Sequence, residues 1–137
     1  ENTSRSGDPE TQVVIPRLKT DLVDIIHAVI DAKLEENDIE WDTDAAACVV
    51  LASGGYPGKF EKGRVIKGLD KSGGADGVTV YHAGTKLRDG RFLTASGRVL
   101  GITATAPTVD NALEIVYRHI GEISFDGMHF RTDIGKC

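Results

Sequence analysis

The order of regular patterns along the chain is the feature that most limits its possible folds. One amphipathic segment of helical period comes first, several short β-rich segments follow, and a second amphipathic segment precedes two short β-rich pieces. Helices that alternate one by one with strands indicate a parallel, doubly wound sheet, whereas strands grouped between helices indicate separate layers. We therefore expect an α+β fold with a small, mostly antiparallel sheet flanked by helices.

Two helices are predicted from apolar residues that recur three and four positions apart. The first spans residues 21–35, with Thr20 as its N-cap and an apolar stripe made of Leu22, Ile25, Ile26, Val29, Ile30 and Leu34. The second follows Thr108 as its N-cap and ends at Gly121 in the left-handed conformation. Its buried stripe is predicted to consist of Val109, Ala112, Leu113, Val116 and Ile120.

The β-rich middle of the chain predicts one long strand and several short ones. Residues 46–53 form a continuous apolar run of strand length, in which Cys48 is expected to be a buried thiol. The shorter strands are expected at residues 64–67, 78–82, 91–94 and 98–104, with edge pieces at 123–125 and 129–131. The Asp89–Gly90 pair predicts a tight hairpin because both positions tolerate positive φ.

Charge and apolar patterning exclude two classes of partner. The net charge of −5 argues against a nucleic-acid surface, which requires a basic face. No apolar run approaches the length of a transmembrane helix, so we expect no membrane partner. The two cysteines, Cys48 and Cys137, have no metal-like spacing, and a reducing cytosol fits their number.

The first candidate site is the charged segment at residues 1–12. On an extended strand Glu1 and the residue two positions later, Thr3, would face the same side, which suits two ligands of one magnesium ion. Arg5 would reach that side too and could stabilise a phosphoryl group in transfer. Asp8 and Glu10 could hold an amine-bearing substrate. A solvated, charged turn would have the same composition, and both interpretations remain open.

Three further segments could bind anions, each with a simpler structural alternative. The glycine-rich residues 52–59 follow a strand, but they match no nucleotide motif and fit a tight loop. Lys86 and Arg98 stand at strand edges and could clamp a phosphate. His82 is expected to be a structural histidine, and Lys71 in a glycine-flanked turn is a distant candidate for a carrier-domain lysine.

Several motifs in order along the chain resemble the phosphoribosylamine–glycine ligase family of ATP-grasp enzymes. The matching segments are Arg5 and residues 7–12, 16–22, 55–58, 62–63, 82–85, 97–100 and 131–135. The resemblance covers nearly the whole chain. It implies ATP-driven joining of glycine to 5-phosphoribosylamine through a glycyl phosphate, in de novo purine biosynthesis, with Mg²⁺ or Mn²⁺ at the phosphates.

The resemblance also implies roles for individual residues. Glu1 matches the metal-binding glutamate, and Thr3 stands where the family has a second metal ligand, an asparagine. Arg5 matches the catalytic arginine beside the phosphates, and Asp8 and Glu10 fall on the substrate-facing turn. Lys86 and Arg98 are expected to bind substrate. Two further departures from the family are Ser6 in place of a phenylalanine and Ser96 in place of a glycine.

The resemblance finally implies a division of the chain and a larger context. Residues 1–40 would be the C-terminal end of an ATP-grasp domain (strand, loop and helix), and residues 41–137 the C-terminal domain of the ligase. We expect the remaining lobes of the same cytoplasmic enzyme to be the partner of this chain, which alone would not turn over ATP. The alternative is a non-catalytic module that reuses this domain to bind phosphate or a sugar phosphate.

Overall fold

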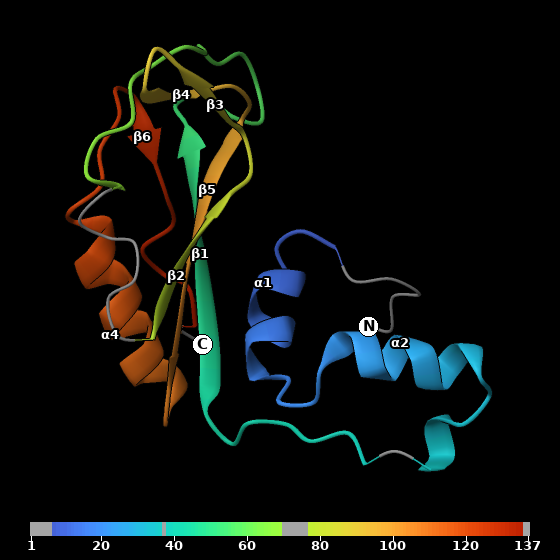
Figure 1. Ribbon diagram of the computed structural model, residues 1–137. Coiled ribbons are helices and arrows are strands. Elements are labelled where there is room, and N and C mark those ends of the chain that lie inside the picture. The colour runs from blue at the N-terminus through green and yellow to red at the C-terminus, as the bar shows by residue number, and fades with distance from the viewer. Residues whose placement is uncertain (1–6, 37, 70–76, 136–137) are drawn as a thin grey trace.

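The computed structural model describes residues 7–36, 38–69 and 77–135 and shows an α+β fold (Figure 1). A four-stranded antiparallel sheet has the strand order β2-β5-β1-β6, and a separate two-stranded sheet pairs β3 with β4. The expected antiparallel α+β architecture is therefore confirmed. The predictions that fall on Glu1, Thr3, Arg5, Ser6, Lys71 and Cys137 lie outside the described residues.

The centre of the larger sheet is the long pair of β1 (Ala45–Ser53) and β5 (Arg98–Ala106). Their register places Leu51 opposite Leu100, and these two side chains are fully buried. The apolar run that predicted a strand at residues 46–53 is confirmed, and β5 extends two residues beyond its predicted end. Strand β2 (Val78–His82) pairs with the far edge of β5, and β6 (Met128–His129) pairs with the end of β1.

Helix α4 (Val109–Ile120) covers one face of this sheet (Figure 1). The predicted cap is confirmed, because the Thr108 side chain accepts a hydrogen bond from the Asn111 amide at 3.2 Å. Within the predicted stripe Val109 is exposed, and the four buried members pack on the sheet: Ala112, Leu113, Val116 and Ile120.

The prediction that Gly121 ends α4 in the left-handed conformation is wrong, because its φ is −61°. Successive short-range bonds, from Glu122 to His119 and from Ile123 to Ile120, unwind the helix without a left-handed residue.

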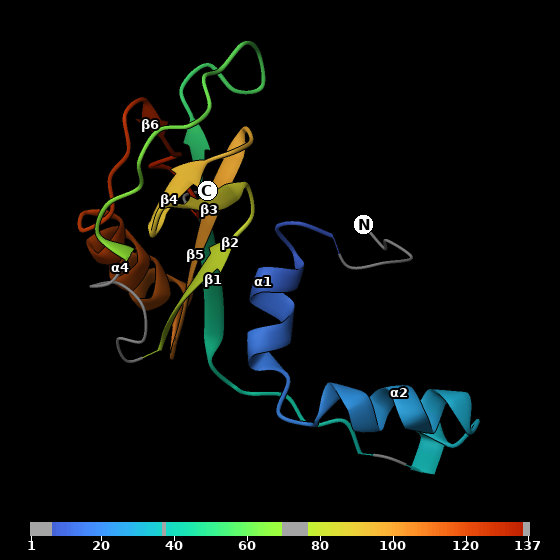
Figure 2. The ribbon, with the colours of Figure 1, turned by 45° about the horizontal axis from the view of Figure 1, so that its top comes forward.

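The opposite face of the sheet contacts a short helix that the sequence did not predict. Helix α1 (Thr11–Val14) continues into the 3₁₀ turn η1 (Ile15–Arg17) and lies beside β1 and β5 (Figure 2). The sheet therefore lies between α4 and α1. This arrangement brings residues 7–12 next to the strands.

Helix α2 (Leu22–Ile30) is shorter than the predicted 21–35 and projects away from the sheet (Figures 1 and 2). Its N-cap is Asp21, whose carboxylate accepts from the Val23 amide at 2.7 Å, because the Thr20 hydroxyl accepts from Glu40 instead. The helix ends early where Ala32 takes a φ of 55°, and the 3₁₀ turn η2 (Leu34–Glu36) follows. Its apolar side chains are largely exposed, led by Val23, Val29 and Ile30.

The remaining β predictions are confirmed in part. The hairpin of β3 (Thr85–Arg88) and β4 (Arg91–Thr94) turns through Asp89 and Gly90, both at positive φ as predicted. Residues 64–67 form isolated bridges instead of a strand, because Val65 pairs with Leu93 on one side and Lys67 with Ser124 on the other. In the part of the chain that the structure describes, no helix has the length and apolar character of a membrane span.

Candidate functional site

A cavity of about 540 Å³ opens between the N-terminal turn and the end of strand β2. The turn and α1 form one wall and the end of β2 forms the other; the lining residues are Gly7, Asp8, Thr11, Gln12, Ile15, Tyr81, His82 and Ala83. The cavity thus lies where the first candidate site meets the main sheet. Two segments about seventy residues apart in sequence are needed to form it.

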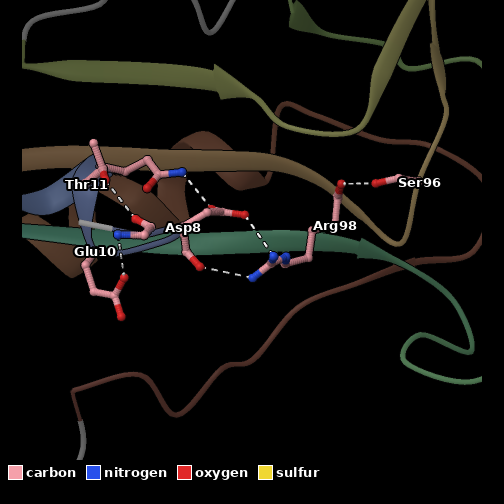
Figure 3. A network of polar contacts seen from close by, with 7 residues as sticks. Asp8, Glu10, Thr11, Ser96 and Arg98 are labelled. Carbon is pink, nitrogen blue, oxygen red and sulfur yellow. Dashed lines mark hydrogen bonds and ion pairs between the residues drawn. The ribbon is translucent and has the colours of Figure 1, made fainter. Parts of the chain in front are cut away.

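The N-terminal turn is closed by its own hydrogen bonds (Figure 3). The Gly7 amide donates to Oε2 of Glu10 at 3.2 Å, and the Thr11 hydroxyl donates to the Gly7 carbonyl at 2.8 Å. Gln12 Nε2 donates to Oδ1 of Asp8 at 2.7 Å. Four charged or polar side chains are therefore used to hold one turn in shape at the mouth of the cavity.

Arg98 ties this turn to the sheet (Figure 3). Its NH2 group lies 3.2 Å from Oδ2 of Asp8, and its NH1 group donates to the backbone carbonyl of Asp8 at 3.1 Å. The two side chains are 43% and 37% exposed, so the ion pair is partly screened by water. Nevertheless, Arg98 binds the side chain and the main chain of the same residue, which fixes the geometry of the contact.

The structure brings together three of the predicted substrate-binding residues, and the fourth, Lys86, makes none of their polar contacts. Asp8, Glu10 and Arg98 belong to the polar network of the N-terminal turn, in which Arg98 binds Asp8 and Glu10 accepts from the Gly7 amide (Figure 3). Lys86 lies exposed on β3, opposite Leu93, and it takes no part in that network. The expected phosphate clamp of Lys86 and Arg98 and their roles in substrate binding therefore stay predictions.

The glycine-rich loop after β1 has a packing role in the structure. Gly55 has a φ of 94°, and a Cβ atom there would overlap the Lys59 carbonyl. The ring of Tyr56 lies directly on Gly97, where a Cβ atom would also overlap it. Because Ser53 donates from its amide to the Gly97 carbonyl at 2.8 Å, the loop supports the backbone just before Arg98. These contacts favour the tight-loop interpretation of residues 52–59.

Two groups of the sheet near the cavity, Tyr81 in its lining and the neighbouring Cys48, have raised pKa values. Burial raises the pKa of the Tyr81 hydroxyl, and the neighbouring Cys48 raises it further. Burial also raises the pKa of Cys48, an effect that the Thr103 hydroxyl opposes and the negative charge of Asp8 reinforces. Both groups therefore keep their protons at neutral pH. His82 Nδ1 lies 2.8 Å from the Thr85 hydroxyl and its ring is 4.6 Å from Phe92, as in a structural histidine.

Sequence reasoning missed Gln12 and Tyr81 as members of the site. Gln12 was part of the matched motif, but its contact with Asp8 depends on the helical turn of α1. Tyr81 gave no signal beyond its place before His82 in a strand. The pairing of β2 with β5 brings it to the cavity, and periodicity alone cannot reveal that pairing.

The carboxylates of the described turn do not form a metal site. Oδ1 and Oδ2 of Asp8 are occupied by Gln12 and Arg98, and Oε2 of Glu10 is occupied by the Gly7 amide. Across residues 7–36, 38–69 and 77–135, no group of three or more His, Cys, Asp or Glu side chains is arranged to hold a metal ion. The predicted metal ligands remain Glu1 and Thr3, outside those ranges.

Comparisons with known proteins agree over almost the whole chain. A family model described as "Phosphoribosylglycinamide synthetase, C domain" matches residues 46–137. A phosphoribosylamine–glycine ligase of Caldanaerobacter subterraneus is 47% identical over 98% of the chain and 31% of its own length. The corresponding protein of Synechocystis is 46% identical over 98% of the chain and 32% of its own length.

A solved structure supports the same relationship. The crystal structure of a phosphoribosylamine–glycine ligase from Thermotoga maritima matches with a TM-score of 0.72 at 28% identity, over 94% of this chain and 31% of that one. The chain therefore spans about a third of the length of the relatives that it matches. From the family match and this shared fold, the chain belongs to the phosphoribosylglycinamide synthetase C-domain family.

Proposed function

We propose that the chain supplies the C-terminal part of a phosphoribosylamine–glycine ligase. The reaction would join glycine to 5-phosphoribosylamine, with cleavage of ATP to ADP and phosphate, and yield glycinamide ribonucleotide for purine biosynthesis. The observation that carries this proposal is the match of relatives with that name over 98% of the chain at up to 47% identity. The same relatives favour a ligase over the alternative of a non-catalytic phosphate-binding module.

The exposed apolar face of α2 supports the proposal that further lobes pack on this chain. Val23, Val29 and Ile30 are 57%, 57% and 72% exposed, and such a patch is typical of a surface that another part of a protein covers. The chain corresponds to about 31% of each relative, so the lobes that bind ATP would lie in the other two thirds. Residues 1–40 would then be the end of the ATP-grasp domain and residues 41–137 the C-terminal domain.

The proposed chemistry passes through an acyl phosphate. A glycine carboxylate oxygen attacks the γ-phosphorus of ATP, and ADP leaves. The amine of 5-phosphoribosylamine then attacks the glycyl carbonyl carbon, the C–N bond forms, phosphate leaves and the amine loses a proton. Charge develops on the transferred phosphoryl group, so a fixed cation beside it stabilises the transition state. Arg5 is the residue of this chain that we assign to that role.

The N-terminal turn and the cavity beside it would bind and orient the amine-bearing substrates. Oε2 of Glu10 is held by the Gly7 amide, which directs the carboxylate and leaves Oε1 for an ammonium group. Tyr81 keeps its proton at neutral pH and can therefore donate a hydrogen bond. Asp8 forms part of the cavity wall and is held by Arg98 from β5, while Lys86 on β3 would supply positive charge.

Glu1 and Thr3 both offer the hard oxygen donors that Mg²⁺ or Mn²⁺ prefers, so this pair fits the expected metal. A divalent ion held there would screen the charge of the triphosphate. Because purine biosynthesis uses metabolites of the cytosol, we also propose a cytoplasmic location.

A reconstitution experiment tests the proposal. The 137-residue chain alone should release no ADP in the presence of ATP, Mg²⁺, glycine and 5-phosphoribosylamine. Mixing it with the N-terminal two thirds of the Caldanaerobacter relative should give ADP release that requires both glycine and the amine. The N-terminal part alone is the control. Substrate-dependent turnover by the isolated chain would refute the proposed division of the enzyme.

A further inference from the structure

We propose that Arg98 is a positioning residue: it latches the Gly7–Gln12 turn onto strand β5 and so holds one wall of the cavity in place. This inference deepens the proposed function and rests on it for its catalytic consequence. The latch joins residues 90 positions apart in the sequence. In this role Arg98 acts through Asp8 and does not reach a substrate phosphate directly.

Two nitrogen donors of the Arg98 guanidinium are already bound to oxygens of Asp8. NH2 and NH1 of Arg98 bind the carboxylate and the carbonyl of Asp8 at 3.2 and 3.1 Å. The second carboxylate oxygen of Asp8 accepts from Gln12 at 2.7 Å, so the bond network extends into α1. A phosphate could bind these two donors of Arg98 only by displacing Asp8 and releasing the turn.

Hydrogen bonds fix the backbone of β5 on both sides of Arg98. The backbone at Arg98 is held by the Ser96 hydroxyl, which donates to the Arg98 carbonyl at 2.9 Å. On either side, the Ser53 amide donates to Gly97 and the amides of Ala83 and Gly84 donate to Val99. Gly97 and Val99 are buried, whereas Asp8, Pro9 and Glu10 of the turn are exposed. The buried strand is therefore the anchor and the exposed turn is the part that is held.

The latch predicts a loss of substrate affinity rather than of chemistry. Arg98 does not need to touch the reacting atoms, and its removal would let the wall formed by Gly7, Asp8 and Gln12 move. The KM of a substrate bound at that wall should therefore rise while kcat changes less. The KM of ATP should stay nearly constant.

The first arm of the test measures amide hydrogen exchange in the 137-residue chain. In Arg98→Gln the amides of Thr11 to Val14, which bond back to residues 7–10, should exchange about fivefold faster, an effect scaled to a partly exposed charged contact. Arg98→Lys should restore part of the protection, because an ammonium cannot bind both oxygens in the same fork geometry. Asp8→Asn should have a smaller effect, since the Asp8 carbonyl remains available to NH1.

Arg118→Gln is the matched control, because Arg118 forms an exposed ion pair with Glu114 within α4. Unchanged exchange in β1 and β5 verifies that each variant is folded. Exchange of residues 11–14 in Arg98→Gln that equals wild type or the Arg118→Gln control would overturn the latch.

The second arm measures kinetics in a chimeric ligase that joins this chain to the N-terminal two thirds of the Caldanaerobacter relative. In Arg98→Gln the KM for glycine or 5-phosphoribosylamine should rise about fivefold, with less than about a twofold change in kcat and in the KM of ATP. Arg98→Lys should recover part of the loss and Arg118→Gln should match wild type. Faster exchange with unchanged KM values would overturn the positioning role. An inactive wild-type chimera would contradict the proposed function instead, and the exchange arm would still decide whether the latch exists.

Discussion

Thr103→Val should stabilise the protein, because it removes a buried hydroxyl that lacks a good partner. Thr103 is 1% exposed in the middle of β5, and its Oγ1 makes no well-formed hydrogen bond among the described residues, because only the weakly interacting thiol of Cys48 lies near it. Its register partner is Cys48, whose thiol is a weak hydrogen-bonding group. A buried polar group without a partner costs about 1–3 kcal/mol, and the thiol offsets part of this cost. Valine has nearly the same shape, so the variant should gain about 1 kcal/mol.

The assay is urea denaturation followed by circular dichroism, together with the thermal midpoint. A gain of about 1 kcal/mol corresponds to about 4 °C in a chain of this size. Thr94→Val is the matched control, because Thr94 is also buried, at 2% exposed, but its hydroxyl accepts from the Arg64 amide at 3.1 Å. That variant should lose about 1 kcal/mol or more, since it leaves the amide without its partner. A Thr103→Val variant less stable than wild type, alongside the expected loss in Thr94→Val, would refute the reasoning.

Two further predictions concern the backbone under Tyr56 and the thiol of Cys48, which is only partly buried and not fully buried as the sequence predicted. Gly97→Ala should destabilise the chain by about 1–3 kcal/mol in urea denaturation, because the new methyl group overlaps the Tyr56 ring. In a Tyr56→Ala background the Gly97→Ala change should be nearly neutral. An equal loss of stability in both backgrounds would contradict this reasoning. Burial raises the pKa of Cys48 above its ordinary value of 9.0. Above pH 9.0 the unfolded chain therefore releases the thiol proton while the folded chain retains it. The free energy of unfolding should consequently fall as the pH rises. Denaturation below and above pH 9.0 should show a smaller fall in Cys48→Ala than in wild type; identical slopes would exclude this contribution.

The elements that the sequence predicted correctly are those whose pattern is local. An unbroken apolar run gave β1, and Asp89 with Gly90 gave the hairpin, because each depends on neighbouring residues. Thr108 was identified as the cap of α4 for the same reason. The N-cap of α2 could not be predicted from neighbouring residues. Asp21 takes this role instead of Thr20 because the Thr20 hydroxyl accepts a hydrogen bond from the distant Glu40 amide.

The candidate site depends on contacts between distant residues that local sequence patterns do not predict. The motif at residues 7–12 indicated a turn with carboxylates, and the structure places that turn beside a cavity. The partner of Asp8 is Arg98, and no periodicity connects two residues that far apart. The pairing arises because α1 packs on the β1–β5 pair and brings the turn to the start of β5. Charge alone suggested a phosphate ligand for Arg98, whereas tertiary packing gives it a carboxylate.

The chimeric ligase gives the most direct measurement of the central claim, that this chain forms the C-terminal part of a glycine-joining enzyme. The matched 31% of the Caldanaerobacter relative would be replaced by this chain, and the product would be followed by mass spectrometry with isotope-labelled glycine. We predict label in glycinamide ribonucleotide, with ADP release that stops when glycine or 5-phosphoribosylamine is omitted. A folded chimera that forms no labelled product, under conditions where the unmodified relative does, would contradict the claim.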